Sequence, residues 1–204
     1  MLHMTNKTHS TAVVIIPPED VWEPIQAIRR EHDRQVRRWM PHITLLYPFR
    51  PREEFDALAE QFAQALREVE PFEVRLAKLC YFEHGEESLT LWLAPQPPGP
   101  LVNLHETLWG IVPDCDEVRR HREGFTPHLS VGQAKGREKL KKLRLALQPA
   151  WRPVSFTVRE VSLIERGDPP DDVFRAATTV PLAGDRRNSE EVRNSNDESN
   201  PKSE

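Results

Sequence analysis

Residues 41–45 and residues 127–131 follow one five-residue formula: proline, histidine, aliphatic, hydroxyl, aliphatic. The first copy reads Pro-His-Ile-Thr-Leu and the second reads Pro-His-Leu-Ser-Val, 86 positions further along the chain. A formula repeated at this distance is too widely spaced for a solenoid unit and indicates two related halves. The fold must therefore place the two motifs in equivalent positions.

The spacing within each motif is that of a half-buried strand. Residues i and i+2 of a strand point to the same face, and residues i+1 and i+3 point to the other. His42 and Thr44 then share a polar face, as do His128 and Ser130, while the intervening aliphatic residues enter a core. Each proline stands at the start of its strand, where a missing N–H costs little.

The remaining hydrophobic pattern predicts an α+β fold. Strands are expected at residues 12–16, 42–47, 72–82, 89–93, 128–132, 154–164 and 173–180, with helices at 52–67 and 137–147 and others beginning near 18 and 101. An offset of 86 residues maps His42 onto His128 and Leu89 onto Arg175. We therefore predict a bilobal fold in which two pseudo-symmetric antiparallel sheets face a cleft, with the helices outside.

The composition sets the limits of the folded part. Residues 184–204 contain six acidic and four basic residues and only one large apolar side chain, Val192, which predicts a disordered polar tail. We expect residues 1–10 to be flexible and residues 11–183 to form a single domain. The longest apolar run near the N-terminus, 12–16, is too short for a signal-peptide core or a membrane span, so we expect a cytoplasmic monomer with no membrane partner.

The charge balance restricts how the chain could bind phosphates. With 28 basic and 32 acidic residues the net charge is -4, which disfavours nonspecific nucleic-acid binding over the whole surface. One local cluster stands out, since residues 29–38 hold five arginines and two carboxylates. This cluster is either a phosphate-binding segment or the solvated end of a helix.

The paired motifs point to acid–base chemistry. A cleft that holds two imidazoles and two hydroxyls suits a phosphodiester, because one imidazole can remove a proton from the attacking oxygen while the other protonates the leaving oxygen. The hydroxyls can donate to the non-bridging oxygens, where charge grows in the transition state. A zinc site would need a third ligand, and nothing acidic or His-like lies beside either motif, so we expect no metal and no cofactor.

The two His-x-Thr/Ser motifs, each followed by an aliphatic residue, resemble those of the 2H phosphoesterase superfamily, in its 2′-5′ RNA ligase and RNA 2′,3′-cyclic phosphodiesterase branch. This resemblance implies hydrolysis or transesterification of 2′,3′-cyclic or 2′-5′ phosphodiester bonds in RNA ends or small nucleotides. It assigns catalysis to His42 and His128 and phosphate binding to Thr44 and Ser130. For hydrolysis of a cyclic phosphate we assign His128 as the base and His42 as the acid.

Further residues near the motifs are candidates for substrate binding. Aromatic rings can stack on a nucleobase, and arginines of the cluster can hold flanking phosphates; the candidates are Tyr47, Phe49, Phe125, Arg34, Arg37 and Arg38, with Phe82 and Trp92 nearby. Each ring could equally pack in the core. A catalytically weak nucleotide- or RNA-binding module with the same fold is the alternative function, and the sequence does not separate hydrolysis from ligation.

Overall fold

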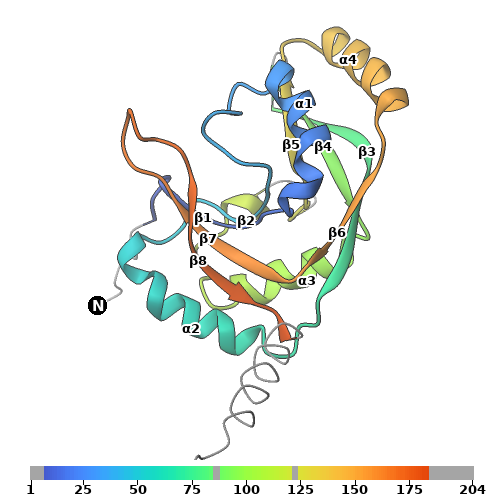
Figure 1. Cartoon of the computed structure of the whole chain (residues 1–204). Coiled ribbons are helices and arrows are strands. Elements are labelled where there is room, and N and C mark those ends of the chain that lie inside the picture. The colour runs from blue at the N-terminus through green and yellow to red at the C-terminus, as the bar shows by residue number, and fades with distance from the viewer. Residues whose placement is uncertain (1–6, 85–87, 121–123, 184–204) are drawn as a thin grey trace, which may run out of the picture.

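The computed structural model describes residues 7–84, 88–120 and 124–183 (Figure 1). The strands in these segments are β1 (Thr11–Ile15), β2 (Ile43–Leu46), β3 (Phe72–Glu83), β4 (Leu89–Gln96), β5 (Leu129–Ala134), β6 (Val154–Val158), β7 (Glu160–Glu165) and β8 (Arg175–Pro181). The α-helices are α1 (Trp22–His32), α2 (Phe55–Ala65), α3 (Gly99–Trp109) and α4 (Arg137–Ala150). The predicted polar tail, residues 184–204, and residues 1–6 lie outside the described segments.

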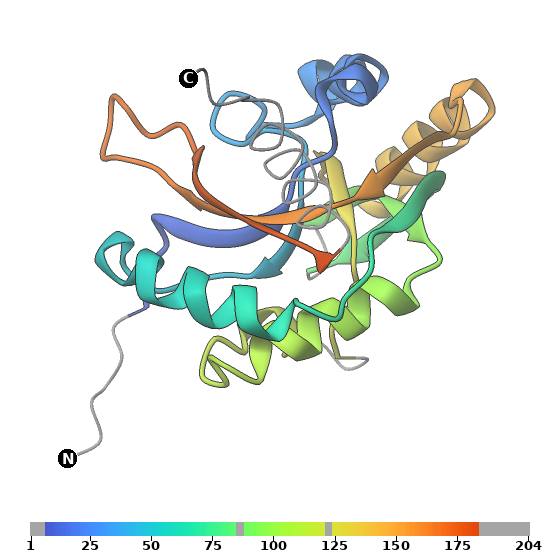
Figure 2. The same ribbon diagram turned by 60° about the horizontal axis from the view of Figure 1, so that its bottom comes forward.

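The strands form two antiparallel sheets of four, with the orders β2-β1-β7-β8 and β5-β4-β3-β6. Figure 2 shows α2 and α3 side by side on one side of the sheets, with α1 and α4 at the opposite side. This arrangement confirms the predicted α+β fold with two antiparallel sheets. Among the described residues, no helix has the length and apolar character needed to cross a bilayer.

The N-terminal residues 7–10, expected to be flexible, are bonded to the rest of the chain. Thr8 pairs with Phe49 through two backbone hydrogen bonds, with N···O distances of 2.7 and 3.2 Å. The ammonium group of Lys7 lies 2.6 Å from a carboxylate oxygen of Glu117. The ordered domain therefore begins before β1.

The motif strands β2 and β5 each lie at the edge of a sheet, and each pairs with one neighbouring strand. β1 lies beside β2 as β4 lies beside β5, so β4 is the counterpart of β1. The mapping of Leu89 in β4 onto Arg175 in β8 is therefore wrong, because β4 opens the second half of the chain rather than closing the first. Each half runs strand, helix, motif strand, helix, strand.

The predicted single strand at 154–164 is also wrong, since it forms two strands in different sheets. β6 pairs with β3, whereas β7 pairs with β1 and β8. The chain changes sheet at Arg159, whose carbonyl accepts a hydrogen bond from the N–H of Leu182 at 2.7 Å. As a result, the sheet that carries the first motif is completed by strands from the second half of the chain.

The first motif strand contains a β-bulge directly after its hydroxyl residue. Thr44 pairs with Val14, but the next pair along the ladder joins Val13 to Leu46. Leu45 is therefore the extra residue, and its side chain is fully buried. Bulges bend a strand locally and are frequent beside active sites, where they redirect side chains.

The second motif strand has its bulge at the equivalent position. Ser130 pairs with Trp92, and the next pair joins Leu91 to Gly132, which leaves Val131 as the extra residue. Val131 is fully buried, as Leu45 is. The repeated formula thus specifies a repeated distortion of the backbone as well as a repeated pattern of side chains.

Helix α1 packs closely against β5 at Gly132. A Cβ atom added at this glycine would lie 2.8 Å from the Cβ of His32 and 3.1 Å from its carbonyl oxygen. The backbone of the helix cannot move away cheaply, because α1 is anchored by the buried side chains of Ile25 and Arg29. The absence of a side chain at Gly132 therefore sets the distance between α1 and β5.

We predict that Gly132→Ala lowers the free energy of unfolding by about 1–3 kcal/mol, the usual cost of overpacking a close contact. Gly99→Ala is the matched control, because an added Cβ there meets no atom within 4 Å. Urea unfolding of both variants at neutral pH measures the difference. Equal midpoints for the two variants would contradict the close contact between α1 and β5.

Candidate active site

The two motif histidines are held by the same hydrogen bond. Nδ1 of His42 lies 2.7 Å from the carbonyl oxygen of Met40, and Nδ1 of His128 lies 2.8 Å from that of Thr126. Because a carbonyl only accepts, each Nδ1 carries the proton and donates it. In the neutral ring, Nε2 of each histidine is then the nitrogen without a proton.

A cavity of about 180 Å³ brings residues of the two motifs together. His42 of the first motif and Ser130 of the second both line it, together with Thr90 and Gln133 from β4 and β5. His128 is near enough for its charge to lower the pKa of His42. The separate halves of the chain thus contribute to a common site.

The surroundings of His42 favour its neutral form. The ring of Trp39 stacks on the imidazole with centroids 4.6 Å apart, and Phe174 stacks on Trp39 at 3.8 Å. Part of the imidazole remains exposed, yet the packed side chains exclude enough water to lower the pKa of His42 to about 4. The bond to Met40 opposes this shift, while the charges of Arg29 and His128 add to it and that of Asp33 opposes it.

His128 lies against a different aromatic pair. Phe82 and Trp92 stack on each other with centroids 4.7 Å apart. Both meet the ring of His128 edge-on, at 4.9 Å for Phe82 and 5.8 Å for Trp92. These two aromatic residues of the hairpin formed by β3 and β4 therefore orient the histidine of the second motif.

The hydroxyls of Thr44 and Ser130 lie on the site faces of β2 and β5, where both residues are partly exposed. Within the described segments, neither hydroxyl is hydrogen bonded to another protein group. Their O–H groups are therefore free to donate to a ligand. The aliphatic residues between them and their histidines, Ile43 and Leu129, are fully buried, as the strand pattern predicted.

A buried ion pair forms one wall of the cavity. Arg29 and Asp33 are 2% and 7% exposed, and Nε of the arginine lies 2.8 Å from a carboxylate oxygen of the aspartate. The guanidinium also donates to the carbonyl of Trp39 at 2.8 Å. The second carboxylate oxygen accepts from the backbone N–H of Gln35 at 2.8 Å and from the side chain of Gln133 at 2.9 Å.

Sequence reasoning missed the role of this ion pair and of Gln133. Arg29 was counted with the exposed arginines, although it follows Ile25 by one helical turn and so falls on the apolar face of α1. An arginine on an apolar stripe with an aspartate four residues later is a signal for a buried pair. Nothing in the sequence near Gln133 indicates its contact with Asp33, which is 100 positions away.

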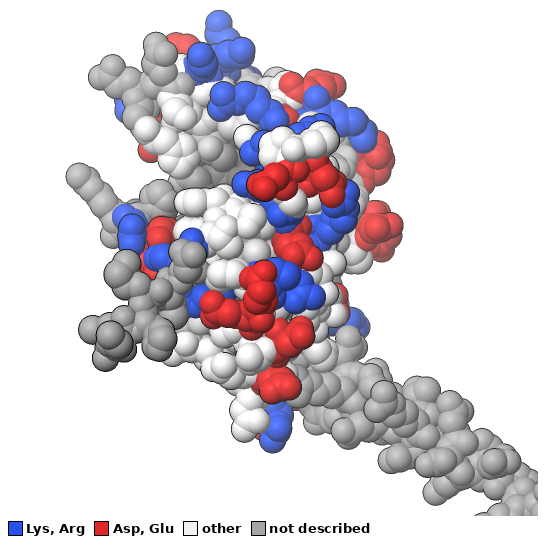
Figure 3. Space-filling view, turned by 90° about the vertical axis from the view of Figure 1, so that its left-hand side faces the viewer, with Lys and Arg blue, Asp and Glu red and all other residues white. Residues whose placement is uncertain are grey.

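The arginine cluster is largely neutralised by carboxylates. Arg37 and Arg38 both bind Asp172, with N···O distances of 2.5 and 2.6 Å. Arg30 pairs with Glu23 at 2.5 Å. Figure 3 shows basic and acidic side chains interspersed over one face of the molecule. A phosphate would have to compete with Asp172 for Arg37 and Arg38.

The predicted aromatic contacts divide between the site and the core. Tyr47 is partly buried and meets the ring of Trp39 edge-on at 5.5 Å, and Trp39 in turn stacks on His42. Phe49 is fully buried and packs on Phe55 and Phe62, so the prediction that it stacks on a base is wrong. A side chain with no exposed surface offers nothing to a ligand.

The buried His105 contacts residues of both motif regions. Its Nδ1 donates to the carbonyl of Leu45, the bulge residue of β2, at 2.9 Å. Its ring stacks at 4.0 Å on Phe125, three residues before His128. Phe125 therefore supports the approach to the second motif, and the buried His105, whose pKa burial lowers, connects that approach to the first.

The site contains groups for proton transfer and for hydrogen-bond donation. In the described segments, no three His, Cys, Asp or Glu side chains come together as metal ligands would. What the cavity does bring together is a neutral imidazole, a second imidazole nearby, hydroxyl groups and a buried guanidinium. These are groups that suit an anionic substrate.

Equivalent histidine motifs on two pseudo-symmetric sheets place this protein among the 2H phosphoesterases. The chain belongs to the 2′-5′ RNA ligase superfamily, whose family model matches residues 17–170. A Geobacillus kaustophilus protein named as a candidate phosphoesterase is 28% identical over 123 residues, which cover 59% of this chain and 67% of that protein.

Solved structures share the fold. The crystal structure of TT0787 from Thermus thermophilus matches with a TM-score of 0.57 and 22% identity, over 85% of this chain and 98% of that one. The structure of Escherichia coli LigT complexed with 3′-AMP matches with a TM-score of 0.58 and 17% identity, again over 85% of this chain and 98% of that one. At these identities the likeness concerns the fold alone.

We predict that Asp33→Asn lowers the free energy of unfolding by about 3–5 kcal/mol, because it leaves the buried charge of Arg29 without a counterion. Glu23→Gln is the matched control on α1, since it removes the same charge from the exposed pair with Arg30 and should leave stability unchanged. Urea unfolding at pH 7 measures both effects. If the two variants are equally stable, the buried pair does not hold the site together.

Proposed function

We propose that this protein is a metal-independent phosphodiesterase that opens 2′,3′-cyclic or 2′-5′ phosphodiester bonds in RNA ends or small nucleotides. The observation that carries the proposal is the identical Nδ1–carbonyl hydrogen bond at His42 and His128, which places the ring proton on the same nitrogen in both motifs. Two imidazoles prepared in the same way suit a reaction that takes up one proton and delivers another.

In hydrolysis of a cyclic phosphate, the base accepts a proton from water while the water oxygen bonds to phosphorus. The bond from phosphorus to the 2′ or 3′ oxygen breaks, and the acid donates its proton to that oxygen. Thr44 and Ser130 donate hydrogen bonds to the non-bridging oxygens, where negative charge accumulates. Formation of a 2′-5′ bond is the same ring opening with the 5′ hydroxyl of another strand in place of water. The 5′ oxygen bonds to phosphorus, the bond to the 3′ oxygen breaks, and the acid protonates that 3′ oxygen.

The roles of the histidines follow from their surroundings. A base must be neutral before the reaction, and burial holds the pKa of His42 at about 4. We therefore assign His42 as the base and, since the leaving oxygen needs a proton, His128 as the acid. This reverses the assignment made from the sequence, where nothing distinguished the environments of the two rings.

The relatives support the choice of substrate class. LigT, with which this chain shares its fold, has been crystallised with 3′-AMP. A 3′-monophosphate is what remains when the bond to the 2′ oxygen of a 2′,3′-cyclic phosphate is broken. The alternative, a catalytically weak nucleotide- or RNA-binding module with the same fold, predicts binding without turnover.

Replacing either motif histidine should abolish most of the activity. We expect His42→Ala and His128→Ala each to lower kcat by about 10²–10⁴-fold, the usual contribution of a positioned acid or base. The double variant should lose far less than the product of the two effects, because both residues act in one step. The assay uses a panel of 2′,3′-cyclic and 2′-5′ linked nucleotides in EDTA, with identification of the product isomer.

His9→Ala is the control for this series, because His9 is exposed and contacts the site only through the edge of Tyr47. Full turnover by either motif variant would refute the assignment. Loss of activity in EDTA that zinc or manganese restores would identify a metallohydrolase instead. Nucleotide binding with no turnover by the unaltered protein would establish the binding module.

The assignment of His42 as the base also predicts the pH dependence. A depressed pKa keeps this ring neutral well below the ordinary value of about 6.5, so kcat/KM should hold until the pH approaches 4. NMR titration of the histidine ring signals, assigned by the signal lost in His42→Gln, measures this pKa directly. A ring that titrates near 6.5, together with an acid limb at the same pH, would contradict the role of His42 as the buried base.

A further inference from the structure

Helix α4 concentrates positive charge that the sequence reasoning did not single out. It carries Arg137, Lys139, Lys141, Lys142 and Arg144, and its only carboxylate is Glu138. Its one fully buried side chain is Leu140. The helix therefore presents most of its basic side chains to solvent, in a chain whose net charge is -4.

One side of α4 borders a hollow of about 590 Å³ between this helix, the end of α1 and the end of β5. We refer to this hollow as the basic groove; the residues that define it are His32, Arg34, Gln133, Ala134, Lys139 and Lys142. Two carboxylates also border it: the buried Asp33, which is paired with Arg29, and the exposed Glu31.

The cations of the basic groove are available to a ligand. In the described part of the chain, Arg34, Lys139 and Lys142 form no ion pair, in contrast to Arg29, Arg30, Arg37 and Arg38 of the arginine cluster, which each pair with a carboxylate. Of the three candidate arginines, only Arg34 thus remains free of a competing carboxylate. The basic groove joins it to two lysines that lie about a hundred residues further along the chain.

The basic groove adjoins the cavity that holds His42. Asp33 and Gln133 line both spaces, so these two residues stand between the groove and the cavity. The cavity measures about 180 Å³, which is below the range of about 300–1,000 Å³ typical of small-molecule sites. It has room for the reacting group, and the rest of a larger substrate must lie outside it.

We propose that the basic groove binds the phosphates of single-stranded RNA on the 5′ side of the reacting bond. This inference rests on the proposed function. A 2′,3′-cyclic phosphate ends its strand, so every other phosphate of that strand lies on its 5′ side. With the terminal group beside His42, the strand leaves past Gln133 and its backbone meets Arg34, Lys139 and Lys142.

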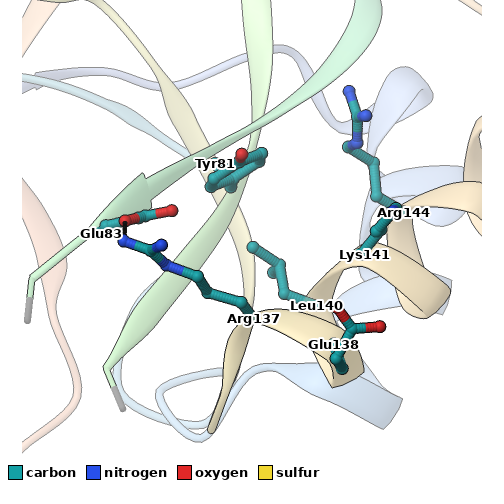
Figure 4. A pocket seen from close by; sticks show the side chains of 7 residues that line it. All are labelled: Tyr81, Glu83, Arg137, Glu138, Leu140, Lys141 and Arg144. Atoms are coloured by element: carbon teal, nitrogen blue, oxygen red, sulfur yellow. Dashed lines mark hydrogen bonds and ion pairs between the residues drawn. The ribbon is translucent and has the colours of Figure 1, made fainter. Parts of the chain in front are cut away.

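The test compares two double variants of the same helix. Lys139→Ala with Lys142→Ala removes two charges from the basic groove, and Lys141→Ala with Arg144→Ala removes two from the other side of α4. The second pair lines a separate pocket of about 350 Å³ beside Tyr81 and Glu83 (Figure 4). The two variants therefore have the same net charge and differ in where the charge is lost. The control variant also removes the contact of the half-buried Arg144 with the ring of Tyr81.

Both variants are assayed with a nucleoside 2′,3′-cyclic monophosphate and with a short single-stranded RNA that ends in a 2′,3′-cyclic phosphate. The groove variant should raise KM for the RNA about tenfold at low salt, leave its kcat unchanged, and leave both constants for the mononucleotide unchanged. Loss of two phosphate contacts should also reduce the slope of log KM against log salt concentration by about 1.4. The control variant should match the unaltered protein on both substrates.

Equal weakening by the two double variants would overturn the proposal, since it would mean that the net charge alone attracts RNA. An unchanged KM for RNA in the groove variant would overturn it as well. Turnover of the mononucleotide tests the proposed function separately. Fluorescence anisotropy with a labelled RNA that ends in a 3′-phosphate tests the groove without turnover, so failure of one is distinguishable from failure of the other.

Discussion

The buried ion pair between Arg29 and Asp33 is the interaction on which the geometry of the site depends. It joins the end of α1 to the carbonyl of Trp39, whose ring stacks on His42, and to the side chain of Gln133 on β5. Burying two charges costs several kcal/mol for each ion unless hydrogen bonds replace the lost water. Here the carboxylate accepts three hydrogen bonds and the guanidinium donates to three partners. The hydrogen bonds that offset the cost of burial therefore also hold the neighbouring groups in place.

The site combines symmetry of construction with asymmetry of surroundings. Both motif strands have the same bulge and both histidines the same backbone hydrogen bond, so the chain positions two equivalent imidazoles. His42 is backed by Trp39 and by the apolar cluster around Phe174, whereas His128 meets the edges of Phe82 and Trp92. Burial beside these rings lowers the pKa of His42 to about 4, although the two imidazoles hold equivalent positions.

Local pattern was enough to predict the motif strands, the burial of the residues between their polar side chains, and the α+β class, because these depend on the two-residue period of a strand. Pairing between distant segments was not predictable from that period. The break at Arg159 had one sign in the sequence: apolar residues occupy even positions up to Val158, whereas Val161 and Leu163 occupy odd ones. The contact of Arg38 with Asp172, 134 positions away, and that of Gln133 with Asp33 had none, since surface charge and amide groups carry no periodic signal.

The first sheet contains strands from both halves of the chain, and this affects when the sheet can form during synthesis. β1 and β2 leave the ribosome early, yet β1 lies between β2 and β7, and β7 ends at Glu165. Until that late segment is synthesised, β1 presents an unpaired edge, which is an aggregation hazard. At roughly 5–20 residues per second, the interval between the two strands lasts many seconds. The sheet that carries the first histidine motif is thus completed only when β7 and β8 have been synthesised.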